Sequence, residues 1–222
     1  MKYFLIKLST VIFLLSFGTE TFAQNFGIQA GLNLSNMIIK NDENNFSEDY
    51  KMKTGFHFGP TVEFPINEMF SFESALLLST KGTITANERE TYDAYMFKQK
   101  INMFYLDIPI SAKAAFKLGS SKIYGRFGPY AGIGLNAKIK TKLTTDGKTE
   151  TNKENISFGS NGDEIKRIDY GLSAGVGIEF KEMQLGITYG LGLANISGAP
   201  TNGSIIKNRV LSISFGYKIG EN

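Results

Sequence analysis

Cysteine is absent from the 222 residues of this chain, and histidine occurs once, at His57. Without cysteine the chain can form neither a disulfide framework nor a thiolate metal site. A single histidine excludes a metal site built from several histidines, and a serine-type catalytic triad would have to use His57. Stability is therefore expected to come from strand pairing and packing.

A strong excess of charge is also missing, since 24 Lys and Arg face 21 Asp and Glu, a net charge of +3. Proteins that bind nucleic acid normally concentrate basic residues in a stripe or patch, so the sequence argues against a nucleic-acid partner. The Gly-x-Gly pairs at Gly132, Gly175 and Gly190 lack the third glycine of a dinucleotide site. Acidic residues at 42–43 and 163–164 lack the ligand spacing of a calcium loop. We expect no cofactor and no bound metal.

Long apolar runs are missing as well, apart from one short run near the start. Lys2 and Lys7 lead into a mostly apolar run from Leu8 to Phe17, and small residues follow up to Ala23. This is the pattern of a secretory signal peptide. The run is shorter than the roughly 20 residues that a membrane-spanning helix needs. We expect residues 1–23 to be removed, which leaves a net charge of +2, and residues 24–222 to form one β-barrel domain.

What the chain has in abundance is alternation of apolar with polar or small residues. Since a β-strand sends alternate side chains to opposite faces, each such segment is predicted to be a strand with one apolar face. The pattern occurs in eight segments: Asn25–Asn36, Lys53–Phe64, Met69–Thr80, Asn102–Lys117, Lys122–Lys138, Asp169–Phe180, Met183–Leu193 and Asn208–Ile219. Most of them reach the roughly 9–11 residues that a tilted strand needs to cross a membrane.

The connections between these segments alternate in length. Three are short, namely Pro65–Glu68, Leu118–Ser121 and Lys181–Glu182, and four are long and polar, namely Met37–Met52, Lys81–Ile101, Ile139–Arg167 and Ile196–Lys207. Short periplasmic turns and long extracellular loops are typical of outer-membrane barrels. Within the longest connection, Asp146-Gly147 and Asn161-Gly162 are hairpin-turn pairs, so its ends are expected to continue as strand beyond the bilayer. The fold prediction is an all-β, eight-stranded antiparallel up-and-down transmembrane β-barrel.

Seven charged residues fall on the phase that this fold turns inward: Glu63, Glu73, Asp107, Lys113, Arg126, Asp169 and Glu179. Paired carboxylates can perform acid–base chemistry, and charges in a lumen can conduct ions. An eight-stranded barrel, however, is just wide enough to be filled by its own side chains. Buried charges need partners, and Lys113 and Arg126 are the natural partners for the carboxylates. We interpret the set as a structural salt-bridge network in a side-chain-filled lumen.

Six segments resemble the PorT-like outer-membrane β-barrel family of Bacteroidetes-type bacteria, also called the porin family or outer membrane protein β-barrel domain: Phe26–Asn36, Tyr105–Lys113, Gly128–Ala137, Asp169–Phe180, Tyr189–Ile196 and Asn208–Tyr217. The resemblance implies an outer-membrane location and an up-and-down barrel, and its founding member resembles a component needed for protein secretion. The barrel-insertion machinery usually prefers a final aromatic residue, whereas this chain continues from Tyr217 to Asn222. The signal for membrane insertion is therefore expected around Phe215 and Tyr217.

The predicted function is that of a small integral outer-membrane protein without enzymatic activity or an open pore. Its role would be structural, adhesive or accessory to secretion, and carried by the long loops. The expected partners are outer-membrane lipid, the barrel-insertion machinery, and an extracellular or secretion-system protein. Two alternatives stay open. One is a secreted lipocalin-like barrel with an apolar interior, and the other is an outer-membrane lipid or peptide hydrolase that uses His57, although no Gly-x-Ser-x-Gly motif occurs.

Overall fold

The computed structural model describes residues 24–41, 50–89, 95–145, 148–159, 165–198 and 203–219, without the side chains of residues 86–89 and 95. The predicted signal peptide, Met1–Ala23, lies outside these ranges, as do both predicted turn pairs, Asp146-Gly147 and Asn161-Gly162. Within the described ranges, no helix is long and apolar enough to cross a membrane.

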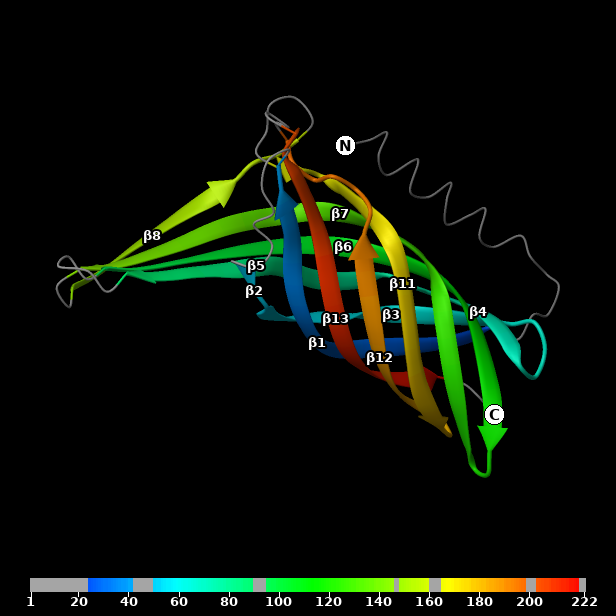
Figure 1. Ribbon diagram of the computed structural model, residues 1–222. Coiled ribbons are helices and arrows are strands. Elements are labelled where there is room, and N and C mark those ends of the chain that lie inside the picture. Colours follow the sequence, from blue (N-terminus) through cyan, green and yellow to red (C-terminus); the bar gives the residue numbers. More distant parts are fainter. Residues whose placement is uncertain are drawn as a thin grey trace, which may run out of the picture.

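Strands make up most of the described chain (Figure 1). They are β1 (Asn25–Lys40), β2 (Tyr50–Lys51), β3 (Lys53–Pro65), β4 (Phe70–Ala75), β5 (Leu77–Arg89), β6 (Tyr95–Leu118), β7 (Ser121–Thr145), β8 (Lys148–Ile156), β9 (Phe158–Gly159), β10 (Ile165–Lys166), β11 (Ile168–Phe180), β12 (Met183–Gly192) and β13 (Ile205–Ile219).

Eight long strands form a closed ring when β4 and β5, which are separated at Leu76, are counted as one. The ring runs β1, β3, β4 with β5, β6, β7, β11, β12 and β13, and each pair of neighbours is antiparallel. It closes where β1 pairs with β13, from Phe26 opposite Ile219 to Lys40 opposite Ile205. The predicted eight-stranded up-and-down barrel is confirmed. Because every strand has two neighbours, the backbone can satisfy its hydrogen bonds inside lipid.

Apolar side chains cover the outside of the ring and polar ones point inward. Val176 is 65% exposed and Leu185 is 50% exposed, whereas the inward-facing Gln29 is only 7% exposed. An aqueous β-protein would bury the apolar set, so this distribution fits a barrel whose outer surface contacts lipid. The lipocalin-like alternative, which needs an apolar interior, is wrong.

Two of the long connections contain strand, one of them against expectation. Residues 81–101 were expected to form a loop, but β5 continues to Arg89 and pairs there with the start of β6 at Tyr95. The expectation that the next long connection begins as strand is confirmed, since β7 reaches Thr145 and pairs with β8. These segments are polar on one or both faces, so alternation does not reveal them. Figure 1 shows them projecting to one side, beyond the rest of the barrel.

We call this projecting sheet the extension. It consists of residues 82–89 of β5, 95–102 of β6, 137–145 of β7 and 148–156 of β8. The extension lies at the end of the barrel that carries the long connections. That end faces the outside of the cell in outer-membrane barrels, and the end with the short turns faces the periplasm.

A β-bulge in β7 changes which residues face inward near the base of the extension. Phe104 pairs with Asn136 but Tyr105 pairs with Gly134, so Leu135 is an extra residue in β7. An extra residue reverses the alternation that follows it. Asn136 is therefore exposed and Ala137 is buried. Without the bulge, the alternation of Lys122–Lys138 predicts that Asn136 faces inward, and this prediction is wrong for that reason.

Candidate functional site

The periplasmic half of the lumen contains a group of ion pairs that we call the periplasmic cluster. It has three carboxylates and three cations, one from each of six strands: Glu63, Glu73, Lys113, Arg126, Glu179 and Lys218. Lys113 Nζ lies 3.2 Å from Glu63 Oε1 and 3.3 Å from Glu73 Oε2, and it also pairs with Glu179. Lys218 Nζ lies 3.0 Å from Glu63 Oε2 and 3.2 Å from Glu179 Oε2. The cluster is electrically balanced, and most of its members have two partners.

Glycines next to this cluster make room for a large side chain. Lys113 Nζ lies 4.8 Å from the centre of the Tyr124 ring. A Cβ atom at Gly177 or Gly186 would collide with that ring. Alternate glycines on the inner face thus serve packing in a narrow barrel. The Gly175-Val176-Gly177 pair is accounted for in this way, without a nucleotide.

The extracellular half of the lumen has a second group of charges, which we call the Lys81 cluster. Lys81 Nζ lies 2.9 Å from Asp107 Oδ1 and 2.9 Å from Asp169 Oδ2. The ammonium group also lies 4.6 Å from the ring centre of Tyr105 and 4.7 Å from that of Tyr130. Lys81 is 3% exposed. One buried cation therefore holds two carboxylates, and nearby aromatic faces add cation–π attraction.

The sequence-predicted residues thus lie in two groups. Five of the seven belong to the periplasmic cluster, while Asp107 and Asp169 pair with Lys81, which the sequence reading had placed in a loop. Lys218 is not among the seven predicted residues, although it lies on the inward phase of its segment and belongs to the periplasmic cluster. A signal for Lys81 was present, because Ser79, Lys81 and Thr83 continue the inward phase of the preceding strand.

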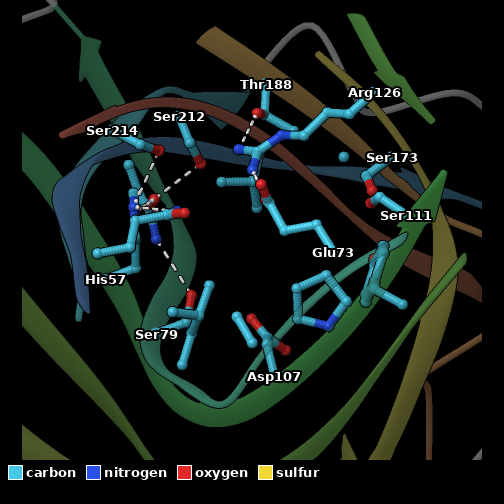
Figure 2. Close-up of a pocket in the computed structure, with 18 of the residues that line it drawn as sticks. His57, Glu73, Ser79, Asp107, Ser111, Arg126, Ser173, Thr188, Ser212 and Ser214 are labelled. Atoms are coloured by element: carbon cyan, nitrogen blue, oxygen red, sulfur yellow. Dashed lines mark hydrogen bonds and ion pairs between the residues drawn. The ribbon is translucent and has the colours of Figure 1, made fainter. Parts of the chain in front are cut away.

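A cavity of about 100 Å³ lies between the two clusters and is bordered by both (Figure 2). On one side the Arg126 guanidinium pairs with Glu73 and donates a hydrogen bond of 2.7 Å to Thr188 Oγ1. On the other side, His57 lies beside the hydroxyl group of Ser214. A polar cavity of this size has room for several water molecules.

His57 occupies the centre of a hydrogen-bond network. Its Nε2 lies 3.0 Å from Ser214 Oγ and 3.2 Å from Gln29 Nε2, and its Nδ1 lies 2.8 Å from Asn33 Oδ1. The Gln29 amide nitrogen can only donate, so Nε2 accepts and Nδ1 donates to Asn33. Ser214, His57 and Asn33 therefore have the order of a nucleophile, a base and an orienting group. His57 is 4% exposed.

An apolar group that the alternation does not predict closes the extracellular end of the lumen. Its buried members are Met37, Met103, Tyr105, Ala137, Ile156, Ile165, Ala194 and Ile196. The segment after β12 is held there because Ile196 N donates to Ile206 O at 2.9 Å and Lys166 N donates to Ile196 O at 2.8 Å. We call this group the apolar cap. Six of its eight members come from five different strands, and Ala194 and Ile196 from the segment after β12, so no single segment predicts it.

No group of three or more His, Cys, Asp or Glu side chains suited to a metal ion occurs in the part of the chain that the structure describes. The polar contacts of the described lumen residues are ion pairs and hydrogen bonds of hydroxyl and amide groups.

Comparisons with known proteins agree with this architecture. Residues 22–198 match the family model described as Outer membrane protein beta-barrel domain. No curated protein matches the sequence. Among solved structures, Ail, the attachment invasion locus protein of Yersinia pestis in complex with the heparin analogue sucrose octasulfate, is 16% identical, with a TM-score of 0.38 over 88% of this chain and 99% of Ail. Neisserial surface protein A is 13% identical, with a TM-score of 0.39 over 87% of this chain and 97% of that protein. By the family match, this chain belongs to the outer membrane protein β-barrel domain family and is a protein of the outer membrane.

Proposed function

We propose that this protein is a closed, non-enzymatic outer-membrane barrel that presents its extension outside the cell in a structural, adhesive or secretion-accessory role. The observation that carries the proposal is the filling of the lumen at three levels. The periplasmic cluster, the Lys81 cluster and the apolar cap follow one another along the barrel. A solute would have to break buried ion pairs at two of these levels, which is costly.

Conductance measurements test the closed lumen. Purified full-length protein, inserted in planar lipid bilayers, is expected to give no steady single-channel current. A porin inserted in the same way serves as the positive control. Stable openings of the wild-type protein would refute the closed barrel.

The extension supports the second half of the proposal because it is the largest polar structure beyond the lipid-facing wall. Photo-crosslinking amino acids at Thr149 and Thr151, which are exposed on β8, are expected to capture a protein partner in intact cells. The matched control places the same group at Ser120, in a short turn at the other rim. A secretion-system component among the adducts would support a PorT-like role, and adducts at Ser120 alone would refute the extension as the interacting part.

A hydrolase is the second candidate, and the contacts of His57 are the specific observation in its favour. The network lies inside a cavity of about 100 Å³, too small for a lipid or peptide substrate. We propose that Ser214, His57 and Asn33 instead link strands β13, β3 and β1. A fluorophosphonate probe for reactive serines is expected to leave the folded protein unlabelled. Labelling that disappears in Ser214→Ala would establish the hydrolase instead.

Insertion into the membrane requires the barrel-insertion machinery as a further partner. We propose that the outer face of β13 carries the signal, since Phe215 and Tyr217 are both exposed there. Replacing both with serine is expected to reduce the amount of inserted protein in cells, while Ser212→Ala, on the inner face, leaves it unchanged.

A further inference from the structure

The outer face of the extension carries a dense group of lysines. Strands β6, β7 and β8 contribute six of them: Lys98, Lys100, Lys138, Lys140, Lys142 and Lys153. We call this group the lysine face. The register places Lys98 opposite Lys142, and Lys140 between Lys100 and Lys153. Like charges directly opposite each other destabilise a sheet, so a bound anion would stabilise this arrangement.

The protein does not supply that anion within the described residues. None of the six lysines forms an ion pair with a carboxylate in the described ranges, and all except the half-buried Lys140 are exposed. The acidic residues of β8 point the other way, because Glu150 is paired with Leu143 and Glu154 with Ile139, on the opposite face. The lysine face is therefore a concentrated positive surface, and the described parts of these three strands place no acidic residue on it.

The lysine face continues the lipid-facing wall of the same strands. On β6 the outward-facing residues are apolar from Phe116 to Phe104, and Asn102 and Lys100 come next. On β7 the bulge leaves Leu135 as the last apolar residue before Asn136 and Lys138. With about 3.3 Å per residue and a strand tilt of about 40°, Lys138 lies about 8 Å beyond Leu135. The headgroup layer of a bilayer extends about 5–8 Å beyond the hydrocarbon core, so Lys138 lies at its outer edge, where its side chain can reach the phosphate groups.

We infer that the lysine face binds phosphate groups of anionic lipid in the outer leaflet, with Lys100 and Lys138 nearest to the membrane. Two observations point to lipid as the occupant. The charge is complementary to phosphate, and the face continues a surface that already contacts lipid. Lysines beside an anionic membrane surface are attracted to it one by one, so six of them on one face form a strong binding surface. Thr149 and Thr151, the sites for protein crosslinking, share this face but lie nearer the tip of the extension, farther from the membrane than Lys138.

Chemical labelling of the full-length protein in nanodiscs tests this inference. The rate of acetylation at each lysine is measured by mass spectrometry in discs of phosphatidylcholine, and again in discs that also contain bisphosphorylated lipid A. We expect labelling at Lys100 and Lys138 to slow about fivefold, the effect of a single lysine–lipid contact. Lys148 is the matched control, because it lies on the opposite face of β8 and is exposed. Equal rates at Lys100 in the two kinds of disc would overturn the inference.

Two further arms identify the source of the anion. Inorganic phosphate added to phosphatidylcholine discs is expected to protect none of the six lysines. Heparin is added in the same way as a sulfated polysaccharide. Protection by heparin without protection by lipid A would show that the face binds polysaccharide, and it would overturn the inference.

Substitutions then test the residues themselves. In Lys100→Gln, Lys138→Gln and Lys140→Gln combined, the affinity for lipid A, measured by native mass spectrometry in detergent, is expected to fall about 100-fold. The control combines Lys122→Gln, Lys148→Gln and Lys181→Gln and is expected to bind like the wild type. Because the first variant removes like-charge repulsion, it should unfold in urea no more easily than the wild type. Unchanged lipid A binding in that variant would refute the lysine face as the site.

Discussion

The two charge clusters of the lumen pair their buried charges in different ways. The periplasmic cluster balances three carboxylates against three cations, and Lys113 and Lys218 share Glu63 and Glu179 between them. The Lys81 cluster holds two carboxylates with one cation. A balanced network keeps some pairing when one member is lost, whereas loss of Lys81 leaves both carboxylates buried and unpaired. The number of partners, more than the number of charges, therefore sets how much stability is lost when one residue is removed.

The largest effect is expected for Lys81→Met. Removing one partner of a buried ion pair costs about 3–5 kcal/mol, because an uncompensated charge remains. The free energy of unfolding is measured by urea titration in detergent with far-UV circular dichroism, since the chain has no tryptophan. Adding Asp107→Asn and Asp169→Asn to Lys81→Met is expected to recover at least half of the loss. A loss typical of surface pairs, below about 1 kcal/mol, would remove the contrast between the clusters.

A smaller effect, and one that separates the two faces of the wall, is expected for an added arginine on β12. Leu185 faces lipid, so Leu185→Arg should destabilise the inserted barrel, by up to about 2–4 kcal/mol, the cost of an arginine at the bilayer midplane. Gln184 faces the periplasmic cluster, and its amide donates to Glu179 Oε1 at 3.0 Å. Gln184→Arg places a cation beside carboxylates and is expected to cost less than Leu185→Arg. Equal destabilisation of the two variants in the same urea titration would contradict the assignment of faces.

Lys218→Met tests the redundancy of the periplasmic cluster. Glu63 and Glu179 both keep Lys113 as a partner, so the loss is limited to hydrogen bonds of a charged group, about 1.5–3 kcal/mol. The measured change in unfolding free energy should be clearly smaller than for Lys81→Met. A loss of unfolding free energy as large as that of Lys81→Met would mean that the shared ion pairs of the periplasmic cluster do not compensate for the loss of one cation.

The smallest effect is expected outside the lumen, at the ion pair between Lys117 and Glu68 near the short-turn rim. The two groups lie 2.9 Å apart, but both are exposed. The hydrogen bond from Lys117 lowers the pKa of the Glu68 carboxyl below its ordinary value. In Lys117→Ala that pKa should return toward the ordinary value in a carbon NMR titration, with no measurable change in unfolding. A clear loss of stability would show that exposure does not separate this pair from the buried clusters.

Much of the fold was predictable from local pattern because membrane strands must alternate. Lipid on one side and a narrow lumen on the other force each residue to suit one of two environments. The alternation of Asp169–Phe180, for example, identifies both faces of β11 correctly. For Lys81 the same alternation predicts the inward face, since Ser79, Lys81 and Thr83 continue that phase. Its partners could not be predicted, because Asp107 and Asp169 lie on β6 and β11 and come within reach of Lys81 only in the folded barrel.

The sequence by itself determined the number of strands, their alternation and which surface meets lipid, since each follows from residues close together in the chain. The tertiary structure decided which charges share a partner, where the bulge at Leu135 reverses the faces of β7, and how residues from distant loops close the lumen as the apolar cap. These features depend on register between strands, and register is set by the whole closed ring.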